Sequence, residues 1–152
     1  MNYYQLKDSQ AFLITQKAVI IKNNKILLLK NEKGCFELPG GLLEMGEEME
    51  TGLEREIKEE LNLSLKKTKN LITCCDYLFK DFKFNDGAKT RDTQIIALAF
   101  KCKLENIRKD ITLSKEHFSF AWLTKKELNG CQFGTGTGKL IKKMLKEKLI
   151  FD

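Results

Sequence analysis

Residues 41–63 read GLLEMGEEMETGLEREIKEELNL, a stretch in which glutamates and apolar residues recur at helical spacing. The spacing predicts a helix over residues 48–61, because a turn of about 100° per residue brings its apolar residues onto one stripe. That stripe consists of Met49, Leu53, Ile57 and Leu61. On the same wheel Glu56 and Glu60 fall at the edge of the stripe, and Glu59 lies beside them. The expected helix therefore carries carboxylates next to its buried face.

These three carboxylates need a partner, because an unpaired half-buried carboxylate is unfavourable and like charges three or four residues apart on a helix repel. Arg55 falls elsewhere on the wheel and is expected to relieve only part of the repulsion. A divalent cation would relieve it, and a set of hard oxygen ligands favours Mg²⁺ or Mn²⁺. Zinc is not expected, since residues 41–63 contain neither histidine nor cysteine. A solvated acidic helix face is the alternative, but it would leave the positions of Glu56 and Glu60 unexplained.

The residues before and after the helix suit the same purpose. Pro39, the only proline, stiffens the chain ahead of Gly40 and Gly41, which allow the backbone to approach an ion or a phosphate closely. Gly46 provides a further turn before the helix, and Gly52 allows close packing within it.

This run resembles the Nudix signature G-x5-E-x7-R-E-U-x-E-E-x-G-U, in which U is a bulky aliphatic residue. Eight of its nine fixed positions match, namely Gly41, Glu47, Arg55, Glu56, Ile57, Glu59, Glu60 and Leu63. Asn62 replaces the last glycine, a mild departure because asparagine also tolerates the left-handed conformation that ends a helix. Residues 36–41, FELPGG, resemble the family's aromatic-x-x-P-G-G lead-in. The resemblance implies an α/β fold, the Nudix-type α/β/α sandwich with a mixed central β-sheet.

The resemblance also implies a reaction, the Mg²⁺- or Mn²⁺-dependent hydrolysis of a nucleoside diphosphate linked to a further group X. By position, the metal ligands would be Glu56, Glu59 and Glu60, helped by the Gly40 carbonyl. Either Glu56 or a carboxylate outside the helix would be the general base. Glu47 would support the loop or an additional ion, and Arg55 would orient a glutamate through a charge-assisted hydrogen bond. A bound metal lowers the pKa of water, neutralises phosphate charge and orients the attack.

Candidates outside the signature are less specific. Some family members recruit a late glutamate to the metal, and Glu116 is the best candidate here, with an ordinary loop carboxylate as the alternative. The adjacent His117 is the only histidine and is expected to be structural, which argues against a catalytic triad. The candidates for substrate binding are Lys30 and Arg91 for phosphates, Phe36 and Tyr77 for stacking a base, and Gly41 for close backbone approach. Solvated surface charges and core aromatics remain the alternatives for these side chains.

Apolar and β-branched runs predict the other elements. Residues 17–22 and 25–30 should form a hairpin around Asn23-Asn24. Residues 71–84, 93–103 and 118–123 should be strands, the first ended by residues 85–87. Thr124 followed by Glu127 predicts a capped short helix, and residues 139–150 a last amphipathic helix. This order predicts a mixed sheet with helices packed on its faces.

Residues 134–139 read GTGTGK, which looks like part of a phosphate-binding loop. The Walker spacing G-x4-G-K-[ST] fails, because Leu140 stands in the Ser/Thr place. We therefore interpret the segment as a flexible lead-in that caps the last helix.

The net charge of +6 is unevenly distributed. Residues 44–60 hold eight glutamates against Arg55 and Lys58, so this segment carries six net negative charges and the rest of the chain twelve net positive ones. The lysines are scattered rather than gathered in a stripe with aromatics, so nothing points directly to nucleic acid. One acidic patch in a basic protein is typical of a metal site that receives an anionic substrate.

Length and composition indicate one domain over residues 1–152, with an ordinary hydrophobic fraction of 42%. No apolar run approaches the roughly 20 residues of a membrane span, and residues 1–10 lack the apolar core of a signal peptide. The five cysteines are odd in number and show no C-x-x-C spacing, which suits a reducing compartment. We expect a cytoplasmic protein with buried cysteines and no membrane partner, and leave a homodimer open.

The substrate is less predictable than the reaction. Family members that act on ADP-ribose often carry a proline after the signature, but the only proline here is Pro39. Motifs of coenzyme A or NADH members are not recognisable either. We expect a nucleoside triphosphate, a damaged nucleotide or a dinucleoside polyphosphate. The alternative is a non-catalytic domain of this family that binds a nucleotide as a sensor or partner module, but such domains usually lose signature glutamates.

Overall fold

The computed structural model describes residues 10–66, 70–84, 90–106 and 110–151. In this part of the chain the strands are β1 (Gln10–Lys22), β2 (Lys25–Lys30), β3 (Phe36–Glu37), β4 (Asn70–Phe82), β5 (Arg91–Cys102) and β6 (Ser119–Leu123). The helices are α1 (Met49–Leu61), α2 (Lys125–Leu128) and α3 (Thr135–Lys146). The expected glutamate helix and the later strands are therefore confirmed within two residues at their ends. The first hairpin is confirmed as well, but its first strand begins at Gln10, seven residues before the expected start at residue 17.

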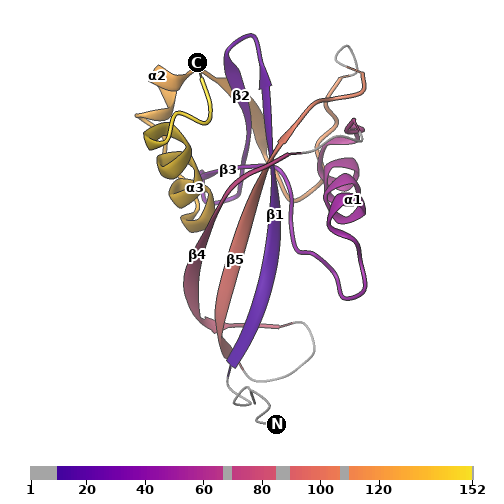
Figure 1. Cartoon of the computed structure of the whole chain (residues 1–152), viewed down its shortest axis with the longest axis vertical. Coiled ribbons are helices and arrows are strands. Elements are labelled where there is room, and N and C mark those ends of the chain that lie inside the picture. The colour runs from indigo at the N-terminus through magenta and orange to yellow at the C-terminus, as the bar shows by residue number, and fades with distance from the viewer. Residues whose placement is uncertain (1–9, 67–69, 85–89, 107–109, 152) are drawn as a thin grey trace.

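The sheet is mixed, as the order of elements predicts, and β1 joins its two parts. Along most of its length β1 pairs in parallel with β5, which pairs antiparallel with β4. At its far end β1 forms the predicted hairpin with β2, and β2 also pairs with β3 and β6. Figure 1 shows the long strands β1, β5 and β4 between α1 on one side and α3 on the other, which is the expected α/β/α arrangement.

Each helix covers its own core. On one face α1 packs Leu53, Ile57 and Leu61, all fully buried, against apolar residues of β1 and β5. On the other face α3 packs Leu140 and Met144 against alternate residues of the same strands. The alternation follows from strand geometry, because successive side chains point to opposite faces of a sheet. Both faces of β1 are therefore buried where the helices cover it.

Local signals fix the ends of several elements. Asn23 and Asn24 have φ values of 50° and 57°, the left-handed conformation that a two-residue hairpin turn needs. Asn62 ends α1 with φ 54°, as expected for the residue that replaces the signature's last glycine. Thr124 and Glu127 form the predicted capping box of α2.

Three expectations about packing and boundaries are wrong. The last helix is not residues 139–150, because the glycine-rich segment forms its first turn, with Gly134 as N-cap and a hydrogen bond from Gly138 N to Gly134 O. Met49 is 50% exposed, because it lies in the first turn of α1, before the buried stripe begins. Of the five cysteines only Cys102 is buried and Cys74 is exposed, because β4 presents one face to solvent.

Other expectations are settled more simply. Arg91 is the first residue of β5 rather than part of the loop before it, and residues 85–87 lie outside the described part of the chain. Among the described residues there is no helix with the length and apolar character that crossing a bilayer requires.

Candidate active site

The glycine loop before α1 is attached to β1 by backbone hydrogen bonds. Gln16 N donates to Gly41 O and Ala18 N donates to Pro39 O, both at 2.8 Å. Gly40, between them, has φ +123°, and a Cβ on it would lie 2.1 Å from the Gln16 carbonyl oxygen. Only glycine can therefore hold this close approach. The loop therefore has a fixed position against β1, within hydrogen-bond distance of the Glu60 carboxylate of α1.

Glu60 is the carboxylate that meets this loop. Its side chain is largely buried, with the residue 8% exposed, and its Oε2 accepts a hydrogen bond from Gly40 N at 2.7 Å. Burial raises the pKa of Glu60 to about 7, although the Gly40 bond and the Lys17 charge act in the opposite direction. His117 Nε2 lies 3.7 Å from Glu60 Oε1, and burial lowers the pKa of His117. The two therefore meet as a neutral histidine and a carboxyl group near neutral pH, rather than as an ion pair.

Arg55 binds the remaining glutamates of the cluster. Its Nη1 donates to Glu56 Oε1 at 3.0 Å and to Glu59 Oε2 at 3.2 Å. Its Nε donates to Glu47 Oε1 at 2.8 Å, and its Nη2 donates to the Leu42 carbonyl. Arg55 was expected to relieve only part of the repulsion among Glu56, Glu59 and Glu60. It does bind two of the three, because its long side chain extends to the side of the helix where they lie.

These contacts divide the glutamates into two kinds. The hydrogen bond from Arg55 lowers the pKa of Glu47, as expected for a carboxylate held by a guanidinium. Burial raises the pKa of Glu56 despite its bond to Arg55. Glu59 is the most exposed of the cluster, with 59% of its side chain accessible. Glu56 and Glu60 are thus the carboxylates that still lack full compensation of their charge.

Gly41 provides the space in which the Glu56 carboxylate sits. A Cβ on Gly41 would lie 2.5 Å from Glu56 Oε2. Gly52 does the same within α1, because its Cβ would meet Glu47 Oε2 at 2.8 Å and Gln16 Oε1 at 2.9 Å. Both glycines therefore let a carboxylate approach the backbone. The sequence predicted close packing at Gly52, whereas at Gly41 it predicted approach to an ion or a phosphate rather than to a side chain.

Sequence reasoning missed Lys17, the basic residue on β1 at the edge of this cluster. Lys17 Nζ donates to the Gly40 carbonyl oxygen at 2.8 Å, and its charge lowers the pKa of both Glu56 and Glu60. The only signal in the sequence was a lysine within an apolar strand, which alternation alone assigns to a surface.

A cavity of about 180 Å³ lies on the α3 side of the sheet, beside Lys17. Its lining includes Thr15, Lys17, Glu37, Tyr77 and the first turn of α3, residues 134–137. The Thr15 hydroxyl is buried and has no hydrogen-bond partner within the described residues. A buried unpaired hydroxyl is unfavourable unless a ligand or water completes it. The cavity thus offers an aromatic ring, a cation and the Glu37 carboxylate, and its cation, Lys17, also contacts the glycine loop.

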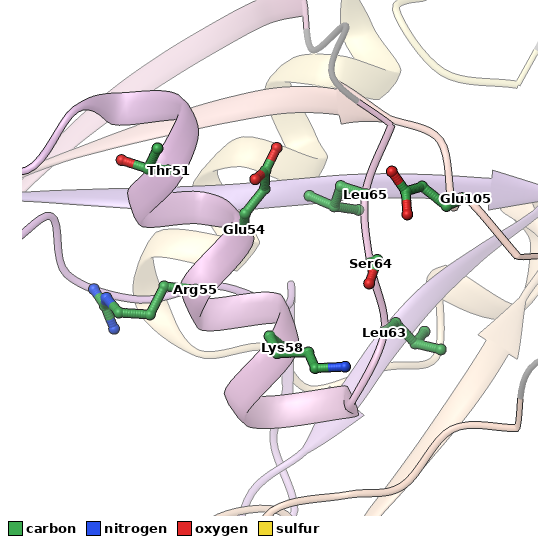
Figure 2. A pocket seen from close by; sticks show the side chains of 8 residues that line it. All are labelled: Thr51, Glu54, Arg55, Lys58, Leu63, Ser64, Leu65 and Glu105. Carbon is green, nitrogen blue, oxygen red and sulfur yellow. The ribbon is translucent and has the colours of Figure 1, made fainter.

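A larger hollow of about 460 Å³ lies on the outer side of α1. Thr51, Glu54 and Lys58 of α1 line it together with the segment from Leu63 to Leu65. Figure 2 shows Lys58 extending toward that segment, while Arg55 points away. Its lining does not include Glu56, Glu59 or Glu60, and the hollow borders the carboxylate cluster through Arg55.

The structure separates the remaining predicted residues. Glu116 is exposed but close enough to Glu60 that its charge raises the pKa of Glu60. Tyr77 lines the cavity, but the residues found around it do not include Phe36, which packs against the α3 core with Lys30 Nζ 5.5 Å from its ring centroid. Arg91 stacks over Phe84 at 5.1 Å, at the far end of β5.

The oxygen donors fit a divalent ion in type. Three carboxylates and a backbone carbonyl form a hard ligand set of the kind that Mg²⁺ and Mn²⁺ prefer. In the described part of the chain, however, no three acidic, histidine or cysteine side chains converge as a ready metal centre. The reason is visible in their partners: Glu56 and Glu59 turn toward Arg55, and Lys17 occupies the Gly40 carbonyl.

Known proteins resemble the chain in sequence. The NUDIX domain family matches residues 14–144. The nucleoside triphosphatase NudI of Enterobacter sp. (strain 638) is 34% identical over 129 residues, which cover 78% of this chain and 86% of that protein. An ADP-ribose pyrophosphatase of Methanocaldococcus jannaschii is 52% identical over 58 residues, which cover 36% of this chain and 34% of that protein. This second match therefore spans only about a third of either protein.

A solved structure confirms the fold. The crystal structure of the MutT protein from Methanosarcina mazei Go1 superposes with a TM-score of 0.69 at 20% sequence identity, covering 93% of this chain and 99% of that one. At this identity the likeness concerns the fold, an α/β/α sandwich with a mixed sheet.

Proposed function

The chain belongs to the NUDIX domain family, and from this premise we propose that it hydrolyses a phosphoanhydride bond of a nucleoside triphosphate in the presence of Mg²⁺ or Mn²⁺. Nudix hydrolases act on nucleoside diphosphate derivatives and generally need a divalent metal. Pyrophosphohydrolase activity therefore follows from membership of the family, whereas the metal ligands and the substrate class are what we propose.

The pairing of Glu60 with the glycine loop supports the metal site best. The Glu60 carboxylate is buried and accepts a hydrogen bond from Gly40 N, and burial raises the pKa of both Glu60 and Glu56. A cation between these two carboxylates would stabilise their charged forms. Glu56, Glu59, Glu60 and the Gly40 carbonyl would hold the ion, with Glu116 as a further candidate. The ion would neutralise phosphate charge and make water a better nucleophile.

The other residues of the signature act on these ligands. Arg55 holds Glu56 and Glu59 through one guanidinium nitrogen and Glu47 through another, so it positions the carboxylates before the substrate arrives. Gly41 leaves the space that the Glu56 carboxylate fills. Proton removal from water falls to Glu56 or to a carboxylate outside α1, since both kinds lie within the cluster.

The cavity beside Lys17 is the proposed place of the nucleoside. Tyr77 supplies an aromatic ring, and Lys17 supplies a positive charge on the side of the glycine loop. A nucleoside triphosphate is preferred over ADP-ribose because the triphosphatase relative matches 78% of this chain, against 36% for the ADP-ribose pyrophosphatase. A sensor module without catalysis is not favoured, because the signature glutamates are all present.

The proposal is tested by incubating the purified protein with Mg²⁺ or Mn²⁺ and a panel of nucleoside triphosphates, ADP-ribose and dinucleoside polyphosphates. We expect metal-dependent release of product with the triphosphates and little with ADP-ribose. A preference for ADP-ribose would overturn the substrate class and leave the metal site standing. No metal-dependent turnover with any of them would favour the binding module.

The ligand assignment is tested by single amide variants. Glu59→Gln and Glu60→Gln should each lower turnover roughly a hundredfold or more, because a neutral amide replaces a charged metal ligand. The matched control is Glu50→Gln, an exposed glutamate in the first turn of the same helix, which should leave turnover unchanged. Melting temperatures in EDTA no lower than that of the wild type would show that folding survives, and unchanged turnover in the first two variants would refute the assignment.

A further inference from the structure

Lys17 joins the two halves of the candidate site. Its Nζ donates to the Gly40 carbonyl oxygen at 2.8 Å, on the loop whose amide holds Glu60. The same side chain lines the cavity under α3 together with Thr15 and Glu37. Lys17 therefore contacts one proposed metal ligand and also faces the proposed substrate cavity.

The carboxylates of the cluster differ in whether a positively charged side chain binds them. Arg55 binds Glu47, Glu56 and Glu59, whereas Glu60 bonds to a backbone amide and faces His117. Lys17 lies near enough to act electrostatically on both Glu56 and Glu60. It thus places a single positive charge on the carbonyl oxygen that a divalent ion would also use.

We propose that the Lys17 ammonium is a built-in counter-ion, which occupies the Gly40 carbonyl in the metal-free enzyme and leaves it when a divalent ion binds. This inference rests on the proposed function, because it takes Gly40 as a metal ligand. The flexible four-carbon stem of lysine permits the move. Since the side chain already borders the cavity, the displaced ammonium turns toward the phosphates of the substrate.

This role has a thermodynamic consequence. Metal binding without substrate works against Lys17, because a like charge must be displaced into a cavity whose lining carboxylate, Glu37, already accepts a hydrogen bond from Asn31. A substrate whose nucleoside occupies the cavity brings its phosphates to the Lys17 side, where they give the ammonium a new partner. Metal and substrate should therefore each tighten the binding of the other, since coupling between two sites is reciprocal.

The first test measures Mn²⁺ binding alone by titration calorimetry, without nucleotide. Lys17→Met keeps most of the stem and removes the charge, so Mn²⁺ should bind about tenfold more tightly than to the wild type. Lys17→Arg keeps the charge and should not bind Mn²⁺ more tightly. Lys142→Met, an exposed lysine on α3, makes the same change in net charge away from the site and should leave Mn²⁺ affinity unchanged.

The second test compares melting temperatures in EDTA and in saturating Mn²⁺. Lys17→Met should be less stable than the wild type in EDTA, where the carboxylates lose their counter-ion, and the difference should vanish or reverse with Mn²⁺. A lysine with a purely structural role would lower stability equally in both conditions.

Two outcomes overturn the inference alone, namely equal or weaker Mn²⁺ binding by Lys17→Met and an equal loss of stability with and without metal. Failure of the proposed metal site is recognised separately. If Glu60→Gln bound Mn²⁺ as tightly as the wild type, the ligand assignment would fall, and the inference with it, whatever Lys17→Met did.

Discussion

Gly40 and Gly46 both have positive φ values, but their surroundings differ. Gly40, at φ +123°, presses against β1, so that a Cβ would lie 2.1 Å from the Gln16 carbonyl oxygen. Gly46, at φ +81°, lies in the turn before α1, and nothing comes within 4 Å of its Cβ position. The first glycine meets a steric and a conformational requirement, whereas the second meets only a conformational one.

Alanine at these positions should separate the two requirements. Gly46→Ala should cost about 1 kcal/mol of unfolding free energy, the penalty of a left-handed L-residue. Gly40→Ala should cost roughly 3 kcal/mol or more and also weaken metal binding, because the loop must leave β1. Urea denaturation in EDTA measures both. Equal losses would show that the contact with Gln16 is easily relieved.

Gly41→Ala tests a contact with a side chain instead of the backbone. Its Cβ would meet the Glu56 carboxylate at 2.5 Å, and a flexible side chain can move away at little cost in stability. We therefore expect turnover to fall about ten- to a hundredfold, because Glu56 is displaced, while the melting temperature changes little. Gly46→Ala is the control for the added methyl group. Normal turnover in Gly41→Ala would mean that the position of Glu56 does not matter for catalysis.

For the helices and strands, periodicity in the sequence correctly predicted which residues are buried wherever the packing depends on one element alone. Leu53, Ile57 and Leu61 recur one turn apart, and all three are buried beneath α1 as predicted. The reach of Arg55 to Glu47 could not be predicted, because it depends on the turn at Gly46 that folds the loop back. A helical wheel contains only the residues of the helix itself.

Contacts between segments that are distant in the sequence could not be predicted either. Lys17 looks like a surface residue of a strand, and its role arises only because Gln16 and Ala18 pair with the glycine loop. The start of α3 was misjudged because glycine disfavours helix locally. Packing reverses that preference, since the first turn lies against β4 and Leu38 N donates to the Thr137 hydroxyl.

Gly136 is the residue through which this packing can be tested. A Cβ there would lie 2.8 Å from the Tyr77 ring, whereas a Cβ on Gly138 would meet Phe133 at 3.3 Å. Gly136→Ala should lower stability by about 1–3 kcal/mol through overpacking, despite the better helix propensity of alanine. Gly138→Ala should be closer to neutral, because the gain in propensity offsets a milder contact. Thermal unfolding of both variants checks the order, and a more stable Gly136→Ala would contradict it.

Strand β1 is both the centre of the sheet and the place where the acidic segment meets a basic residue. Its pairing with β5 and with β2 unites both parts of the sheet, and its middle holds the glycine loop and Lys17. The acidic segment 44–60 thus sits against a chain that is otherwise strongly basic. In the absence of metal, the free energy of unfolding should therefore depend on pH through the most deeply buried of these carboxyl groups, that of Glu60.

The direction of this dependence follows from proton binding. Burial raises the pKa of Glu60 from 4.5 to about 7 in the folded chain. Below pH 4.5 the carboxyl group is protonated in both folded and unfolded states and contributes nothing. Between pH 4.5 and 7 the unfolded chain releases the proton while the folded chain keeps it, so stability falls as pH rises. Above pH 7 both states are ionised and the loss is complete, at about 3 kcal/mol.

Comparison with Glu60→Gln isolates this contribution, because the amide keeps an acceptor for Gly40 N and does not titrate. In EDTA, the variant should have nearly the stability of the wild type at pH 4.5 and become about 3 kcal/mol more stable than it by pH 8. Saturating Mn²⁺ should reverse the order at pH 8, since only the wild type offers the ion a charged ligand there. Urea unfolding across this pH range measures the difference. A constant difference in EDTA would mean that Glu60 ionises normally in the folded protein, and an unreversed one in Mn²⁺ would mean that the ion binds elsewhere.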